Sequence, residues 1–387
     1  MRSSILLVAG SLMLAACADS TSPTGQRAAS TTSAAAQVDV GAEGARGAVF
    51  TETNAVAGNA VVAFARAGDG SLTYAGTFAT GGNGIGGTND PLASQYALVL
   101  DGEDTNLLFA VNAGSNSIST FRVDGATLTL VGTTPSGGTL PVSLAVSRHV
   151  LYALNAGSNT IAGFDIGADG QLTPNAHASA ALAAGAAGGA AVRASRDGQV
   201  LVVTEKGSNT IDVFPVGSDG ALGSPVSSVS SGVTPFGFDF VSGHQIAVSE
   251  AGSGAASLYD FSKTGSLTVE SASVSTNGQA APCWLIATTN GRFAYTANAG
   301  SGTISGYAIG AQGTMQLLVP SGISGSTGAG TTPLDLDLSR GDQYLYVLES
   351  GAGRIGAFSV GANGSLTALA GIGGLAPKSG FQGLATY

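Results

Sequence analysis

Four polar residues close together in the chain are the first candidates for chemistry: His177, Arg193, Glu205 and Lys206. Opening a cyclic ester with water needs a base that activates the water and a cation or amide that stabilises the developing oxyanion. This set supplies both kinds of group, so it is the candidate catalytic set. The main interpretation is nevertheless a polar edge whose groups satisfy one another, with catalysis as the alternative.

The position of His177 separates it from the other two histidines. His177 follows Leu172-Thr173-Pro174 and is predicted to lie in the long connection running to Ala190, which is expected to open at the rim of the candidate site. His149 and His244 are predicted to lie in turns at the opposite rim, exposed to solvent. Arg196 belongs to a turn of that same type and is left out of the candidate set.

Three aspartates form a second group, because Asp239, Asp335 and Asp337 alternate with Phe and Leu on two innermost strands. Carboxylates near the axis of a ring could hold Ca²⁺, a hard cation that prefers several oxygen ligands. No dense calcium-binding loop is present, and contacts with water in a channel are the alternative. Trp284 is either a stacking surface for a sugar or, as is usual for a lone tryptophan, part of the core.

A third group recurs with the repeat at the end of each second strand, where a short polar residue can hydrogen-bond the following turn. Its members are Asn112, Asn155, Glu205, Glu250, Asn298 and Glu349. Turn capping is the main interpretation, and an acidic rim that binds a cation or a cationic ligand is the alternative.

The elements that must position these residues come from a repeat close to Asn-Ala-Gly-Ser-Asn-Thr-Ile-x-x-Phe, present seven times. The closing aromatics, which lie 43 to 57 residues apart, are Phe64, Phe121, Phe164, Phe214, Tyr259, Tyr307 and Phe358. Periods of this size with several short strands per unit are typical of a β-propeller. Apolar residues alternate in steps of two, as in strands, and Asp-Gly or Asn-Gly pairs separate the strand runs. The sequence predicts an all-β, seven-bladed propeller with four-stranded antiparallel blades.

Strand boundaries and ring closure follow from the same pattern. First strands are expected to begin at prolines, namely Pro91, Pro141, Pro235, Pro282 and Pro333, whereas the boundary of the fourth blade is unmarked. The first copy lacks a first strand, and the chain ends with a spare one from Ser379 to Thr386. We expect this strand to close the ring as the innermost strand of blade one.

The net charge bears on partners. The chain has 24 acidic and 14 basic residues, with a net charge of -10, which argues against nucleic acid as a partner. Only 10 percent of the residues are charged, as expected where most strands are buried on both faces. The protein is expected to be a monomer that binds a small carbohydrate-like ligand or a protein partner.

The N-terminus predicts export. Met1-Arg2 precedes a short apolar core, which is too short for a permanent membrane span and is typical of a cleaved signal peptide. Leu14-Ala15-Ala16-Cys17 resembles a bacterial lipoprotein signal, which implies a lipid on Cys17. The domains expected are a signal peptide over 1–16, a flexible tether over 17–45 and the propeller over 46–387. The protein would then be extracytoplasmic and membrane-anchored, at the outer membrane facing the periplasm or at the cell surface.

The repeats resemble the bacterial seven-bladed lactonase-type propellers, which include 6-phosphogluconolactonase and carboxymuconate cyclase relatives. Two segments, Leu151 to Ile161 and Val202 to Ile211, carry this resemblance with their copies over about residues 46–387. The resemblance implies His, Arg and acidic residues on the axial face. The corresponding turns here lack His and Arg, as at Thr234-Pro235-Phe236-Gly237.

Two functions follow. The first is a lipid-anchored propeller that acts mainly as a scaffold for a ligand or protein partner. The alternative is a lactone hydrolase similar to 6-phosphogluconolactonase, and the sequence leaves open whether the chain is an enzyme. No cofactor other than the Ca²⁺ considered above is expected.

Overall fold

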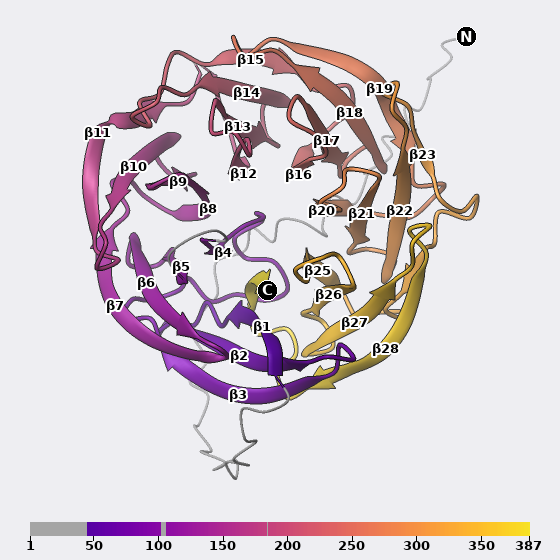
Figure 1. The fold of residues 1–387 in the computed structure, drawn as a ribbon, viewed down its shortest axis with the longest axis horizontal. Helices are drawn as coiled ribbons and strands as arrows, with labels where there is room; N and C mark the ends of the chain where they lie inside the picture. Colours follow the sequence, from indigo (N-terminus) through magenta and orange to yellow (C-terminus); the bar gives the residue numbers. More distant parts are fainter. Residues whose placement is uncertain (1–44, 102–105, 184) are drawn as a thin grey trace, which may run out of the picture.

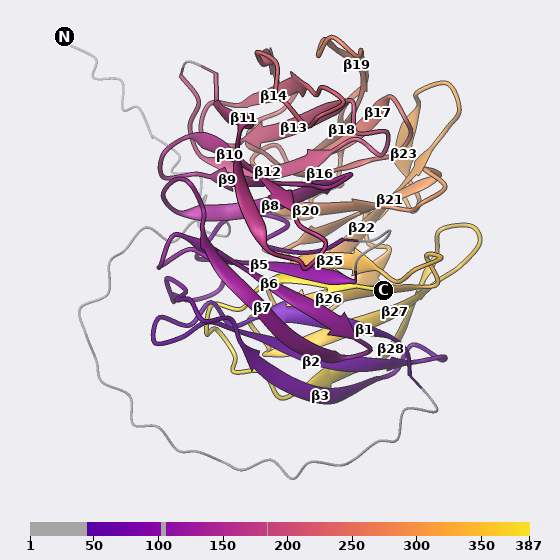
Figure 2. The ribbon, with the colours of Figure 1, turned by 60° about the vertical axis from the view of Figure 1, so that its left-hand side comes forward.

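The chain folds into a ring of seven four-stranded antiparallel sheets, as the sequence predicts (Figure 1). A computed structural model describes residues 45–101, 106–183 and 185–387. The predicted signal peptide, nearly all of the predicted tether and Cys17 lie outside these residues. Figure 2 shows successive sheets lying face to face around the ring, which buries both faces of most strands. The described residues include no helix long and apolar enough to cross a bilayer.

Each blade contributes strands a to d from the axis outwards. The a strands are β29 (Gln382–Thr386), β4 (Leu98–Leu100), β8 (Pro141–Ser147), β12 (Gly189–Ala194), β16 (Pro235–Phe240), β20 (Pro282–Ala287) and β25 (Pro333–Leu338). The b strands are β1 (Ala45–Glu52), β5 (Leu107–Asn112), β9 (Val150–Asn155), β13 (Val200–Glu205), β17 (Gln245–Glu250), β21 (Phe293–Asn298) and β26 (Tyr344–Glu349). The c strands are β2 (Ala60–Ala67), β6 (Ser117–Asp124), β10 (Thr160–Ile166), β14 (Thr210–Pro215), β18 (Ala255–Phe261), β22 (Thr303–Ile309) and β27 (Arg354–Val360). The d strands are β3 (Leu72–Ala79), β7 (Thr127–Pro135), β11 (Leu172–Ala181), β15 (Val226–Val229), β19 (Leu267–Ser275), β23 (Met315–Leu317) with β24 (Gly325–Ser326), and β28 (Leu366–Gly373).

The repeated residues explain why each blade forms and how neighbouring blades adhere. The seven repeat aromatics all lie on c strands and are buried. The glycine of the c–d turn has a positive φ, 85° at Gly70 and 80° at Gly364, which a residue without a Cβ adopts without strain. Its carbonyl accepts a hydrogen bond from a tyrosine of the preceding blade, from Tyr346 to Gly70 and from Tyr295 to Gly364. The turn motif therefore shapes one blade and binds it to the next.

The ring closes as predicted. Strand β29, near the C-terminus, pairs antiparallel with β1, and blade one has the strand order β29-β1-β2-β3. The guanidinium of Arg66 on β2 also donates to the carbonyl oxygen of Tyr387 at 3.2 Å. The chain therefore runs from blade seven into β29, and the main-chain hydrogen bonds of β29 to β1 close the ring.

One predicted strand start is wrong. The a strand of blade two begins at Leu98, not at Pro91, and is only three residues long. The segment from Asp90 to Ala97 instead runs in towards the centre of the ring (Figure 1) and is buried among the a strands of several blades. We call this segment the axial plug. In blade four, the a strand begins at Gly189, near the end of the Ala/Gly run.

Candidate active site in the axial cavity

A cavity of about 1450 Å³ lies along the axis of the ring. Its wall comes from the ends of the a strands and from the turns that follow them, and we call the side of the ring with these turns the a–b rim. The opposite side, with the turns between b and c strands, is the b–c rim. Tyr96 lines the cavity, whereas residues 90–95 of the axial plug do not. The cavity therefore opens at the a–b rim, opposite to the rim predicted for the site.

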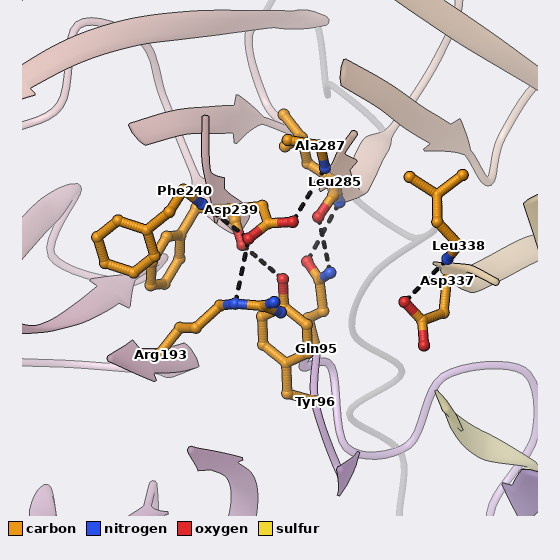
Figure 3. Close-up of polar contacts among 10 residues, drawn as sticks. Gln95, Tyr96, Arg193, Asp239, Phe240, Leu285, Ala287, Asp337 and Leu338 are labelled. Atoms are coloured by element: carbon orange, nitrogen blue, oxygen red, sulfur yellow. Dashed lines mark hydrogen bonds and ion pairs between the residues drawn. The ribbon is translucent and has the colours of Figure 1, made fainter. Parts of the chain in front are cut away.

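An ion pair lies on the cavity wall, between strands of blades four and five (Figure 3). The Nε of Arg193 on β12 lies 3.1 Å from the Oδ1 of Asp239 on β16. The Asp239 side chain is 6% exposed and that of Arg193 is 37% exposed. Burial raises the pKa of Asp239, and the Arg193 guanidinium and the amides of Ala287 and Phe240 counteract that rise. Asp239 thus holds a cation with one side open to the cavity.

A second carboxyl faces the same cavity from blade seven. Asp337 on β25 accepts hydrogen bonds from the amides of Leu338 at 2.9 Å and Thr386 at 2.8 Å. Burial is the largest influence and raises the pKa of Asp337 to about 7, although these amides and Arg193 lower it. A carboxyl with that pKa is part protonated and part ionised near neutral pH, as a general acid or base requires.

Basic side chains surround the mouth of the cavity. Arg148, Arg196 and Arg340 lie in the turns that follow the a strands of blades three, four and seven. Arg148 donates to the carbonyl oxygen of Asp197 in the next blade at 3.0 Å, and Arg196 donates across blade five to that of Thr289 at 3.4 Å. These contacts join the turns of different blades and brace the mouth of the cavity. Asp101, Asp124 and Asp342 also line the cavity, so the arginines lie among acidic side chains.

The structure brings only one of the four predicted catalytic residues to this cavity. Arg193 lines it, whereas His177 lies on β11, the outermost strand of blade three, and is exposed. There His177 lines a separate shallow hollow with His149, Asp165 and Asp219. The prediction placed His177 in a connection towards the axis because the length of β11 is not marked in the sequence.

Glu205 and Lys206 are separated from Arg193 by the length of a strand. Glu205 pairs with Gly189 at the b–c end of β12, whereas Arg193 lies four residues further along, or about 13 Å at 3.3 Å per residue. Lys206 is tied to the axial plug, because its Nζ donates to the carbonyl oxygen of Ala93 at 2.8 Å. Burial lowers the pKa of Lys206 to about 8 and raises that of Glu205 to about 7. Neither residue lines the axial cavity.

The three aspartates predicted as metal ligands are divided in the same way. Asp239 and Asp337 line the cavity, but Asp335 lies deeper and is 2% exposed. Among the described residues, no three His, Cys, Asp or Glu side chains are grouped so that they could hold a metal ion. The donor set that the Ca²⁺ prediction requires is therefore not assembled by these aspartates.

The polar residues at the b–c rim are buried and hydrogen-bonded, mostly within their own blades. Asn112 donates to Ser119 at 2.7 Å, Asn298 donates to Ser305 at 2.9 Å, and Glu250 accepts from Ser273 at 2.7 Å. For Asn112, Glu205, Glu250 and Asn298 the partners include hydroxyl groups on nearby residues of the same blade, and not only the turn amides that the sequence suggested. Asn155 donates to main-chain carbonyl oxygens, and Glu349 pairs with Arg354. Glu52 is the blade-one member of this group, which the repeat comparison missed.

Sequence reasoning missed Tyr96 and the arginines at the mouth of the cavity. A signal for the mouth was present, because Ser-Arg recurs in three a–b turns, at Arg148, Arg196 and Arg340. These turns were assigned to the rim opposite the expected site and were therefore set aside. Tyr96 carries no repeat signal, because the axial plug occurs once in the chain.

The sequence matches the family described as lactonase, 7-bladed beta-propeller, over residues 26–181, 145–281 and 244–373. No curated protein matches it. Among solved structures, it is similar to a putative 6-phosphogluconolactonase from Bacteroides fragilis, with 18% identity, a TM-score of 0.69, and coverage of 88% of this chain and 98% of the other.

Two further structures show the same fold. One is a protein from Lactobacillus plantarum, with 18% identity, a TM-score of 0.70, and coverage of 88% and 99%. The other is a periplasmic gluconolactonase from Pseudomonas aeruginosa, with 17% identity, a TM-score of 0.63, and coverage of 86% and 97%. At these identities the structural likeness establishes the fold alone.

Proposed function

The chain belongs to the lactonase family of seven-bladed β-propellers, and on that premise we propose that it hydrolyses sugar lactones in the axial cavity. The observation that carries this proposal is that Arg193 and Asp337 line the same cavity. They are close enough for the charge of Arg193 to lower the pKa of Asp337. These are the two kinds of group that ester opening by water requires.

The reaction proceeds by direct attack of water. The ionised carboxylate of Asp337 takes a proton from water as its oxygen bonds to the lactone carbonyl carbon. The carbonyl oxygen becomes an oxyanion, which the Arg193 guanidinium stabilises. Collapse of this intermediate breaks the ring C–O bond, and the proton passes from Asp337 to the departing ring oxygen. Asp337 is ionised again once that proton has passed to the ring oxygen. The product is a hydroxy acid, whose new carboxyl group releases the second proton of the water to solvent.

Asp239 has a supporting role in this scheme. Its carboxylate raises the pKa of Arg193 and fixes one edge of the guanidinium, so the cation stays charged and oriented inside the ring. Because Asp239 also accepts amide hydrogen bonds from Phe240 and Ala287, it is itself held by two strands.

The test is hydrolysis of glucono-1,5-lactone by the full chain, corrected for the spontaneous reaction. Arg193→Gln and Asp337→Asn are expected to lower kcat/KM by about 100-fold or more, in line with the loss of an oxyanion donor or a base. His177→Ala, which changes an exposed residue on an outer strand, is the control and should keep full activity. Wild-type activity in both cavity variants, or its loss only in His177→Ala, would contradict the proposal.

A second candidate is a scaffold that binds a ligand or protein partner without turnover. The observation that favours it is on the b–c side of the axis. There the resemblance implies His and Arg, but this chain fills the space with the axial plug and the buried Trp284. Calorimetric binding of an aldonate or lactam analogue, without any lactone turnover, would support the scaffold over the hydrolase.

The lipid anchor is proposed on sequence grounds alone, and with it an extracytoplasmic, membrane-attached location. Cys17→Ser should abolish incorporation of labelled palmitate and release the protein from the membrane fraction. Label retained in that variant would place the attachment elsewhere.

A further inference from the structure

The axial plug is held by the inner strands of four blades. The Ser94 hydroxyl donates to the Val142 carbonyl oxygen at 2.8 Å, and the Gln95 amide group exchanges two hydrogen bonds with the main chain of Leu285. The Trp284 indole N–H donates to the Ser94 carbonyl oxygen at 2.8 Å. The main-chain amide of Gln95 donates to Ala190. One segment from blade two therefore fills the axis and hydrogen-bonds to the a strands of blades three, four and six. Tyr96, near the end of the same segment, adds a hydrogen bond to blade five.

Three residues in or beside the plug adopt the left-handed backbone region, where residues with a side chain are uncommon. The φ angles are 51° at Asn89, 49° at Ala93 and 66° at Tyr96. A tyrosine in that region is a clear outlier that persists only where surrounding contacts fix it. Outliers of this kind concentrate at functional sites, so the role of Tyr96 needs an explanation.

Tyr96 lies directly against the cation of the cavity (Figure 3). The Arg193 guanidinium carbon is 4.6 Å from the centroid of the Tyr96 ring, within the range of a cation–π interaction. The Tyr96 hydroxyl donates to the Phe238 carbonyl oxygen at 2.8 Å, which fixes the ring to blade five. Arg193 is thus held by Asp239 at one edge and by Tyr96 on one face.

We propose that Tyr96 is a positioning residue, and that the axial plug is the element that orients Arg193 for oxyanion stabilisation. This inference rests on the proposed function for its catalytic consequence, but the orientation of Arg193 is a property of the ground state. The plug therefore has two effects: it closes the b–c side of the axis, and it fixes the cation that faces the a–b mouth.

The experiment compares the full chain with Tyr96→Phe and Tyr96→Leu. Tyr96→Phe keeps the ring and should retain kcat within about threefold. Tyr96→Leu removes the ring and should lower kcat at least about tenfold with little change in KM, because Arg193 still binds but is no longer aligned. Tyr74→Phe, an exposed tyrosine on the outer strand β3 whose hydroxyl contacts that of Thr77, is the control and should leave kcat unchanged.

Carboxyl titration by ¹³C NMR gives a second readout that needs no turnover. Because the Arg193 charge lowers the pKa of Asp239, a mobile guanidinium should let that pKa rise in Tyr96→Leu and not in Tyr96→Phe. If the protein proves not to hydrolyse lactones, this titration still tests the position of Arg193. Identical titration and kcat in Tyr96→Leu and wild type would overturn the proposal.

A further variant, which keeps an aromatic ring at position 96, tests the proposal even if Tyr96→Leu does not fold. Pentafluorophenylalanine at position 96 keeps the ring but reverses its quadrupole, so it should behave as Leu does, while Phe behaves as Tyr does. Equal behaviour of the Phe and pentafluorophenylalanine proteins would show that the ring face does not hold the cation.

Discussion

At the scale of single residues, the cavity combines a cation that is held by a carboxylate with a carboxyl that is held by amides. Arg193 and Asp337 are not neighbours in sequence and come from blades four and seven. Each keeps a partly open side towards the cavity, while main-chain amides or a counter-ion satisfy the rest. This division leaves the functional atoms exposed without leaving the charges unpaired.

The raised pKa of Asp337 predicts that the protein loses stability as the pH rises. The unfolded carboxyl ionises near pH 4 and the folded one near 7, so between these values the unfolded state binds fewer protons. The free energy of unfolding should therefore fall between pH 4 and 7, by at most about 4 kcal/mol from this group, at about 1.4 kcal/mol per pKa unit.

Urea denaturation at pH 5 and pH 8 provides the measurement. Asp337→Asn should flatten the decline and be more stable than wild type at pH 8 by about 1 to 3 kcal/mol. Asp169→Asn, in an exposed turn, is the control. The same slope in wild type and Asp337→Asn would show that the folded carboxyl titrates normally.

The buried rim carboxylate Glu250 gives a second prediction at this scale. It accepts hydrogen bonds from the amide of Gly232 and from the hydroxyls of Ser257 and Ser273, and it is fully buried. Glu250→Ala should lower the free energy of unfolding by about 3 kcal/mol, because it leaves these donors unsatisfied. Glu270→Ala, exposed on the outer strand of the same blade, should cost less than about 0.5 kcal/mol. Equal effects in chemical denaturation would mean that the rim is not structural.

At the scale of the element, the plug explains why the sequence did not predict the side of the ring on which the axial cavity opens. Alternation of apolar residues and Gly-containing turns are local signals, and they predicted the blades correctly. The plug has neither signal, and its left-handed residues are fixed by contacts with other blades. Pro91 therefore resembled the other strand starts, although the chain continues to Leu98 before it pairs. Which side of the ring is open depends on this one segment.

Close packing of the plug against blade five predicts the effect of one added methyl group. A Cβ at Gly237 on β16 would lie 2.1 Å from the side-chain oxygen of Gln95, 2.7 Å from the Cys283 carbonyl oxygen and 2.8 Å from the Leu285 amide nitrogen. Gly237→Ala should displace Gln95 and destabilise the fold by about 1 to 3 kcal/mol. Gly243→Ala, where a Cβ would meet nothing within 4 Å, is the matched control. Melting temperatures that agree between the two variants would contradict this account of the plug.

At the scale of the whole molecule, the ring depends on its last strand. Deleting residues 379–387 removes β29, the hydrogen bonds of Arg66 to Tyr387 and the amide that binds Asp337. The truncated protein should lose several kcal/mol of stability and aggregate, because β1 becomes an open edge. Adding the peptide 379–387 in trans should raise the melting temperature again. A melting curve like that of the full chain would mean that the ring closes in another way.

The repeat alone sufficed to predict the seven blades and their closure, because every blade is built from the same local signals. The site depends on what breaks the repeat. The plug occurs once, and the aspartates of the a strands occur only in blades five and seven. Arg193 belongs to the predicted set and lines the axial cavity. Its partners Asp239 and Tyr96 come from other blades, and the sequence carries no mark of that proximity.

The central claim is that Asp337 acts as the base for lactone opening in the axial cavity, and the pH dependence of kcat/KM tests it most directly. The wild-type profile for glucono-1,5-lactone should rise with an apparent pKa near 7 on its acid side, where Asp337 ionises in the free enzyme. In Asp337→Asn this rise should disappear together with most of the activity, while Asp169→Asn keeps the wild-type profile. An unchanged profile and rate in Asp337→Asn would show that another group activates the water, and that the axial carboxyl is not the base.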